Sequence, residues 1–263
     1  MELTTSVRYQ LNSGVAEVVL AAPETGNSFT PELVEQLRGA IAQANANADC
    51  RVIVLSAEGD DFCRGLDLAA LVGDGDSFNE PLLDQIIDCL TAIYRSPKPV
   101  IACVDGSVTG GGLGLVAACD IVLATSNAVF MLSEVIVGMI PAMIAPFLLR
   151  RLSPAQLQYL TLSSCSIDAT EAKDLGLVDN HCEDLAKALK AQLKRLFRSS
   201  PRAIAQSKMY FEQLSPNTLN DQLTIAKQTL VSWLQNSENL HGIQQFSEGL
   251  SPTWFARYPQ RRA

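Results

Sequence analysis

The sequence predicts an α/β protein with a largely parallel sheet and a helical C-terminal region. Three observations lead to this fold class. Short apolar runs with strand character alternate with amphipathic helical patterns, which is typical of parallel strands joined by crossover helices. Loops that contain glycine follow two of these apolar runs. The 263 residues, of which 48% are hydrophobic, also suffice to fill one core.

The first half of the chain gives strands and helices in turn. A hairpin comes first, and a helix then begins at Pro31 with Thr30 as its N-cap. The expected strands lie, in order, within residues 6–21 (two strands), 51–59, 98–106, 120–125 and 128–132. The helices expected among them cover 30–47, 79–95 and the buried segment 112–118.

From about residue 142 the pattern predicts helices almost throughout. We therefore divide the chain into an α/β core, residues 1–200, and a C-terminal helical region, residues 201–263. No repeat or flexible linker marks a second independent domain. The helices expected here cover 142–151, 154–163, 169–175, 183–199, 202–214, 217–235 and 237–248.

Composition excludes several classes of function. A net charge of −8 and a pI of about 4.8 argue against a nucleic-acid partner, whose phosphates require a basic face. No apolar run is long enough to cross a membrane and the first residues do not resemble a signal peptide, so we expect a cytoplasmic protein without membrane contact. The seven cysteines show no CxxC or Cys/His spacing, which predicts neither a disulfide framework nor a metal site.

Two loops that contain glycine are the candidate site. Residues 63–67 follow one predicted strand and residues 110–112 follow the next, and sites in parallel α/β folds form at the carboxyl ends of strands. A glycine turn that opens a helix leaves N–H groups free to bind a developing negative charge. The glycines match neither a phosphate loop nor a dinucleotide fingerprint, and close helix–strand packing is an alternative reason for them.

Four motifs occur in an order and spacing that resemble the enoyl-CoA hydratase/isomerase (crotonase) superfamily. They read FCRGLDL at 62–68, KPVIACVDGSVTGGGLGLVAACDIVLAT at 98–125, VFMLSEVIVGMIPA at 129–142 and IDATEAKDLGLVD at 167–179. The resemblance implies a crotonase-like ββα spiral core. It also implies that the C-terminal helical region serves trimerisation or acts as a lid, in a homotrimer or hexamer.

The resemblance also implies the residues of the site. The backbone N–H groups of Leu66 and Gly111 form an oxyanion hole for a thioester carbonyl, where enolate charge grows during transfer of the α-proton. The remaining glycines of the two loops are assigned to substrate binding. These are Gly65, Gly110, Gly112 and Gly114.

One of the family's two catalytic glutamates is missing. Hydratases that resemble this chain carry the first glutamate two places after the glycine triplet and the second twenty residues further on. Here these positions are Gly114 and Glu134, so we expect single-carboxylate chemistry with Glu134 as the catalytic residue and the substrate in the space beside Gly114. Apolar neighbours should raise the pKa of Glu134. The candidates are Met131, Leu132, Val135 and Ile136.

Residues 111–121, 132–152 and 159–167 most resemble the dehydratases of polyketide β-branching. That resemblance implies loss of water from 3-hydroxy-3-methylglutaryl-acyl carrier protein to give 3-methylglutaconyl-acyl carrier protein. No cofactor is implied beyond the phosphopantetheine arm of the carrier protein or CoA. Basic residues at 194–202 and in the tail at 257–262 are candidates for carrier docking. Candidate partners for the distal carboxylate are Arg64, Tyr94, His241 and Tyr258.

Three other functions stay open at this point. An enoyl-CoA isomerase needs only one carboxylate to move a proton between C2 and C4. A decarboxylase of the same superfamily would release carbon dioxide instead of water. A non-catalytic protein that binds acyl thioesters would explain the absent glutamate by loss of chemistry, although Glu134 is then without a role.

Overall fold

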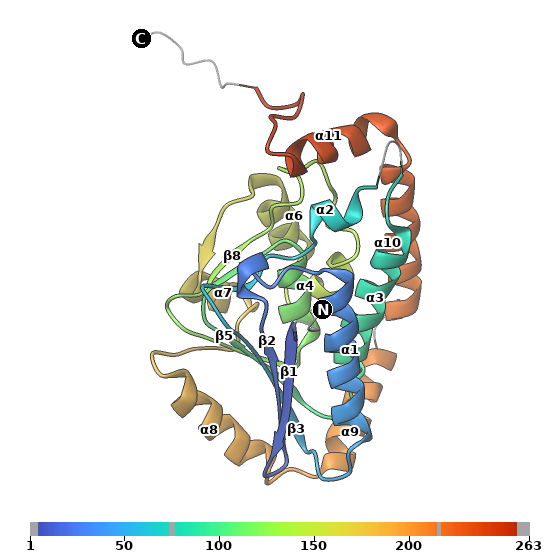
Figure 1. Ribbon diagram of the computed structural model, residues 1–263. Coiled ribbons are helices and arrows are strands. Elements are labelled where there is room, and N and C mark those ends of the chain that lie inside the picture. The colour runs from blue at the N-terminus through green and yellow to red at the C-terminus, as the bar shows by residue number, and fades with distance from the viewer. Residues whose placement is uncertain (1–4, 74–76, 215–216, 257–263) are drawn as a thin grey trace.

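Two sheets stacked along a spiral form the core of the molecule (Figure 1). The computed structural model describes residues 5–73, 77–214 and 217–256. The larger sheet has the strand order β1-β2-β3-β5-β7-β10, with β1 Val7–Asn12, β2 Val15–Leu20, β3 Val52–Ala57, β5 Val100–Val104, β7 Ile121–Ala124 and β10 Asn180–His181. The smaller sheet has the order β4-β6-β8-β9, with β4 Asp61–Cys63, β6 Ser107–Thr109, β8 Val129–Met131 and β9 Ile167–Asp168.

From β3 to β8, consecutive strands alternate between the two sheets. Strand β3 of the larger sheet is followed by β4 of the smaller one, and the pairs β5–β6 and β7–β8 repeat the pattern. All pairings are parallel except the β1–β2 hairpin and β8–β9. The turn of the hairpin has positive φ at Ser13 and Gly14, as a two-residue turn between twisted strands requires. The ββα spiral expected for the core is thereby confirmed.

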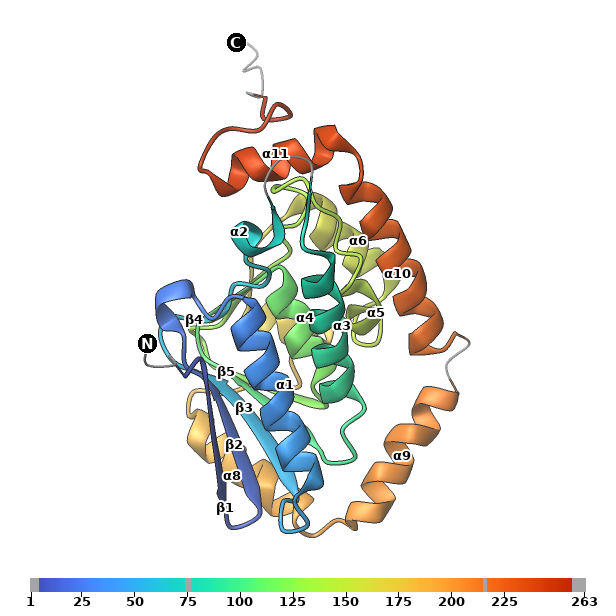
Figure 2. The same ribbon diagram turned by 45° about the vertical axis from the view of Figure 1, so that its right-hand side comes forward.

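Helices cover both faces of the larger sheet. On one face lie α1 (Pro31–Ala46), α3 (Glu80–Tyr94) and the buried α4 (Gly111–Ala118), and on the other lies α8 (Leu185–Leu196), as Figure 2 shows. Side chains of α8 pack on alternate residues of β3 and β5. Helix α1 begins as expected, because the side chain of Thr30 accepts a hydrogen bond from Leu33 N.

The C-terminal half is helical but not continuously so. It contains α5 Ala145–Leu148, α6 Pro154–Ser163, α7 Ala169–Leu175, α9 Pro201–Gln213, α10 Leu219–Leu234 and α11 Ser237–Ser247. The helix expected at 142–151 is only the short α5, and β9 and β10 interrupt the series. The sequence patterns also missed β4, β6, the short helices α2 (Leu68–Leu71) and η1 (Pro23–Thr25), because elements of two to four residues have no periodicity.

Helix α11 lies above the carboxyl ends of the parallel strands, next to α2, and α10 packs beside α3 and α5 (Figures 1 and 2). Helix α9 contacts the core through ion pairs, Lys208 with Asp120 at 2.7 Å and Glu212 with Arg95 at 2.6 Å. Within residues 5–73, 77–214 and 217–256, no helix is both long and apolar enough to cross a lipid bilayer.

Candidate active site

The two glycine loops leave the smaller sheet side by side. Strands β4 and β6 are parallel neighbours, with Asp61 opposite Ser107 and Cys63 opposite Val108. Because parallel strands end at the same edge, the loops that follow them meet there. The sequence pattern placed both loops directly after the long strands β3 and β5, whereas the structure inserts β4 and β6 before them.

Leu66 and Gly111 present unpaired backbone N–H groups. Phe29 pairs with Leu66 in a parallel bridge, in which Phe29 N donates to Gly65 O at 2.6 Å and Asp67 N donates to Phe29 O at 3.4 Å. This pattern directs Leu66 N–H to the opposite side. Gly111 is the first residue of α4, so its N–H has no partner within the helix. No acceptor among the described residues binds either N–H, and both residues line one cavity.

Close approach of the two loops requires their glycines. Gly65 has φ +80°, and a Cβ on it would overlap the backbone nitrogen of Gly111 and lie 2.8 Å from Thr109 O. A Cβ on Gly112 would overlap the carbonyl oxygen of Cys63. Because Gly65 and Gly112 have no Cβ, the two loops can approach closely enough to bring the N–H groups of Leu66 and Gly111 together. Neither Gly65 nor Gly112 lines the cavity. The packing explanation is correct for these two positions, while Gly110 and Gly111 do lie on the cavity wall.

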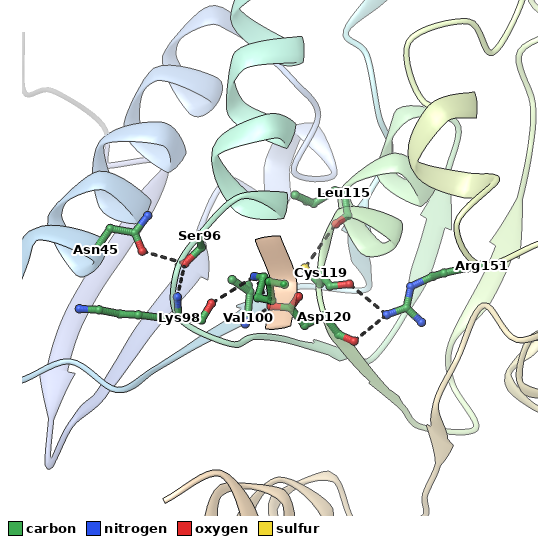
Figure 3. Close-up of polar contacts among 9 residues, drawn as sticks. Asn45, Ser96, Lys98, Val100, Leu115, Cys119, Asp120 and Arg151 are labelled. Atoms are coloured by element: carbon green, nitrogen blue, oxygen red, sulfur yellow. Dashed lines mark hydrogen bonds and ion pairs between the residues drawn. The ribbon is translucent and has the colours of Figure 1, made fainter. Parts of the chain in front are cut away.

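The far end of α4 is fixed by charged side chains (Figure 3). The guanidinium of Arg151 donates to Cys119 O at 3.0 Å and to Asp120 O at 3.1 Å. The carboxylate of Asp120 accepts from Val100 N at 2.8 Å and from Lys208 Nζ at 2.7 Å. These bonds satisfy carbonyl groups at the negative end of the helix dipole, so α4 has little freedom to displace Gly111 at its other end.

Glu134 lies beside the first turn of α4. It follows β8 and is 8% exposed, and a Cβ on Gly110 would lie 3.5 Å from its Oε1. Its Oε2 is buried without a hydrogen-bond partner among the described residues. Burial raises the pKa of Glu134 from 4.5 to about 7, although backbone N–H groups of Glu134 and Ser133 lower it. A carboxyl group with this pKa is suited to both accept and donate a proton near neutral pH.

The apolar wall of the cavity beside Glu134 does not include the four neighbours that we expected to raise its pKa. Met131, Leu132, Val135 and Ile136 do not line the cavity. Its apolar lining instead comes from the first glycine loop and α2, from the residues that follow Glu134, and from helices α10 and α11. It comprises Leu66, Leu68, Val137, Met139, Ile140, Pro141, Met143, Ile144, Leu230 and Phe246. The cavity measures about 230 Å³, and its polar wall contains Arg64, Thr109, Ser133 and Glu134.

Two tryptophans hold the segment that carries Glu134. Trp233 Nε1 donates to Gly138 O at 2.9 Å, and Trp254 Nε1 donates to Ile136 O at 3.2 Å. The Trp254 ring also covers Gly138, where a Cβ would overlap it. Sequence reasoning missed this arrangement, as it missed Leu230 and Phe246, because the partners lie about a hundred residues apart and no local pattern connects them.

Gly114 does not contact the cavity. A Cβ on this residue would overlap Cγ2 of Ile144 and lie 2.8 Å from Ile144 Cβ. The space beside Gly114, which we expected the substrate to fill, is thus occupied by an isoleucine side chain. The assignment of Gly114 to substrate binding is corrected to a packing contact, and Ile144 is the residue that meets the cavity in its place.

Of the candidates for binding a distal carboxylate, only Arg64 lines the cavity among the described residues. Its Nε lies 3.0 Å from Asp61 Oδ2 and its side chain is 63% exposed. Tyr94 instead packs against Phe147, and Cζ of Arg150 lies 3.9 Å from the centroid of the Tyr94 ring. His241 lies on α11, where its Nε2 contacts Gln245 Nε2 at 3.1 Å. Tyr258 and the basic tail at 257–262 lie outside the described residues.

The basic cluster at 194–202 is remote from the cavity. The end of α8 lies against the β1–β2 turn, where Gly14 approaches Phe197, at the amino ends of the parallel strands. The cavity is lined by Leu68 of α2 and Phe246 of α11, and these helices lie at the opposite end of the molecule from α8 (Figures 1 and 2). Within one chain this cluster does not face the site, and its role in carrier docking stays a prediction. The described part of the chain also holds no group of three His, Cys, Asp or Glu side chains that could bind a metal ion.

Comparison with known proteins agrees with the fold and the two loops. The profile of the family described as enoyl-CoA hydratase/isomerase matches residues 10–257. Bacillaene synthase dehydratase PksH of Bacillus subtilis (strain 168) is 30% identical over 256 residues, covering 94% of this chain and 96% of PksH. The solved structure of PksH from Bacillus subtilis aligns with a TM-score of 0.82 at 27% identity, covering 94% of this chain and 99% of that one.

A solved enoyl-CoA hydratase from Mycobacterium avium aligns with a TM-score of 0.80 at 29% identity, covering 96% of this chain and 100% of that one. These matches extend over nearly the whole chain. They agree with the spiral of alternating strands in the structure. The chain therefore belongs to the enoyl-CoA hydratase/isomerase family and is a hydratase-like lyase.

Proposed function

We propose that this protein removes water from 3-hydroxy-3-methylglutaryl-acyl carrier protein and gives 3-methylglutaconyl-acyl carrier protein. The observation that carries the proposal is Glu134, the one carboxylate on the cavity wall among the described residues, buried next to two unpaired N–H groups. A single carboxylate in that position serves an elimination in which one group removes the α-proton and then protonates the leaving hydroxyl.

The reaction begins with the thioester carbonyl in the hole. Leu66 N–H and Gly111 N–H donate to the carbonyl oxygen, and the Glu134 carboxylate takes a proton from C2. Charge then grows on the carbonyl oxygen, where the two fixed donors stabilise it. One such donor typically raises kcat by a factor of about 10²–10³.

Elimination completes the cycle. The protonated Glu134 donates its proton to the C3 hydroxyl, the C3–O bond breaks, and the C2=C3 double bond forms as water leaves. Glu134 returns to the carboxylate, so no further proton donor is required. Both transfers use the same side chain, and hydrogen and hydroxyl therefore leave from the same face of the acyl group.

The proposal also assigns the distal carboxylate, the carrier and the assembly. Arg64 on the cavity wall is the group we assign to the distal carboxylate, since the guanidinium uses Nε for Asp61 and its terminal N–H groups have no partner among the described residues. The similarity to PksH supports a polyketide role. In this proposal the thioester is carried on phosphopantetheine without another cofactor, and the enzyme works as a homotrimer or hexamer in the cytoplasm.

The decisive experiment loads 3-hydroxy-3-methylglutaryl on an acyl carrier protein and follows its intact mass with enzyme present. We expect loss of one water with wild type, and no loss with Glu134→Gln. Retained activity in that variant would refute the role of Glu134. The CoA thioester, tested in parallel, identifies the carrier, and inertness of both substrates would exclude the proposed reaction.

An enoyl-CoA isomerase is the second candidate, because the wall beside Glu134 is apolar and suits an alkyl chain. The same carboxylate would move a proton from C2 to C4. Conversion of a 3-enoyl thioester to its 2-enoyl isomer without loss of water from the hydroxylated substrate would favour this function. Release of carbon dioxide from 3-methylglutaconyl thioester would instead indicate a decarboxylase, and binding without conversion of any of these substrates would indicate a non-catalytic protein.

A further inference from the structure

Ile144 occupies a position next to the oxyanion hole that the reaction itself does not explain. It immediately precedes α5, is 3% exposed over the whole residue, and still contributes to the cavity wall. Its Cβ and Cγ2 fill the space that any side chain at position 114 would need. The pair Gly114–Ile144 therefore places an apolar branched side chain against the face of α4.

The helix geometry locates this side chain relative to the hole. Gly111 and Gly114 are three residues apart in α4, so they share a face and differ by about 4.5 Å along the axis. Ile144 consequently lies one turn beyond the N–H of Gly111. Glu134 lies beside Gly110 at the start of the same helix. A thioester bound to Gly111 N–H thus has a carboxylate on one side of its first acyl carbons and an isoleucine further along.

We propose that Ile144 is a specificity-determining residue, which contacts the substituent on C3 of the acyl group and selects thioesters with an apolar branch at that carbon. The proposal rests on the proposed function, because it places an acyl thioester in the hole with Glu134 at C2. A hydroxyl turned toward Ile144 would lose its hydrogen bonds, whereas a methyl group there is buried against carbon. The hydroxyl is left on the side of Glu134, which is the orientation that elimination requires.

A binding experiment tests the selection without depending on turnover. The probes are S-(3-methylbutanoyl)pantetheine and S-butanoylpantetheine, which differ only by the methyl branch on C3, and the measurement is Kd by calorimetry. We expect wild type to bind the branched probe about tenfold more tightly. Ile144→Ala should reduce this ratio to near one, whereas the control Ile140→Ala, which shortens another isoleucine of the same cavity, should keep it.

A thermal double-variant cycle tests the placement by a second route. Gly114→Ala should lower the melting temperature in wild type because the new Cβ overlaps Ile144. In the Ile144→Ala background the same change should lower the melting temperature less, because the overlap with Cγ2 is gone and only the contact with the Cβ of residue 144 at 2.8 Å remains. Equal effects in both backgrounds would overturn the contact on which the proposal rests.

The two proposals fail in different ways. An unchanged binding ratio in Ile144→Ala, or no preference in wild type, refutes the role of Ile144 whether or not water is lost. A retained preference together with an inert 3-hydroxy-3-methylglutaryl carrier protein refutes the dehydration and leaves the selection at C3 standing. Weak binding of both probes by wild type, with Kd values that differ less than twofold, counts as no preference.

Discussion

Replacing Glu134 with glutamine should make the protein more stable at neutral and alkaline pH while removing its activity. The pKa of this carboxyl group is raised from 4.5 to about 7 by burial, so the folded protein holds a proton that the unfolded chain has already released. The contribution of this carboxyl group to the unfolding free energy is fully present below pH 4.5. It is lost as the pH rises from 4.5 to about 7. The difference corresponds to roughly 3 kcal/mol of unfolding free energy.

Urea denaturation followed by circular dichroism, at a series of pH values from about 5 to about 8, measures the effect. The unfolding free energy of wild type should fall relative to Glu134→Gln by about 2 to 3 kcal/mol across that range. Glu24→Gln, which removes an exposed carboxylate, is the control for the loss of one charge. If the difference in unfolding free energy between wild type and Glu134→Gln were the same at every pH, Glu134 would be solvated in the folded protein. The argument from its burial would then be wrong.

Three further predictions concern the same site. For dehydration, kcat/KM should rise with pH to a plateau with a midpoint near pH 7, because Glu134 must start as the carboxylate; a flat profile would contradict this. Trp254→Ala should move that midpoint to lower pH by letting water reach Glu134, while Phe211→Ala, an exposed aromatic change on α9, should not move it. Gly112→Ala should destabilise the protein by about 2 kcal/mol or more in urea denaturation, since its Cβ overlaps the backbone of β4, whereas Gly39→Ala in the open face of α1 should stabilise it by up to about 1 kcal/mol.

Local signals predicted the long elements of the fold. The Thr30–Pro31 helix start and the apolar runs of β3 and β5 express preferences of neighbouring residues, and the structure confirms them. Strands β4 and β6 of three residues each carry no such signal. They exist because β4 pairs with β6 and β6 pairs with β8, which is a property of the assembled sheet.

The site was predictable only in the part that motifs encode. The two glycine loops and Glu134 follow from short stretches of sequence, and the structure places them together around one cavity. Ile144, Leu230 and Phe246 were not predicted, because an apolar residue on a cavity wall has the same local pattern as one in the core. Similarly, only the folded chain shows that the space beside Gly114 is already filled.

The division of labour within the cavity bears on how such enzymes can diverge. In the proposed mechanism main-chain N–H groups bind the thioester carbonyl, and α4, which carries one of them, is held at its far end by Arg151 outside the cavity. The carboxylate and much of the apolar wall come from a single stretch, residues 133–144. In this mechanism, a few substitutions in that stretch would change the reaction that the bound thioester undergoes, while the main-chain N–H groups that bind its carbonyl stayed in place. The reaction can thus change through substitutions in one segment while the rest of the fold is kept.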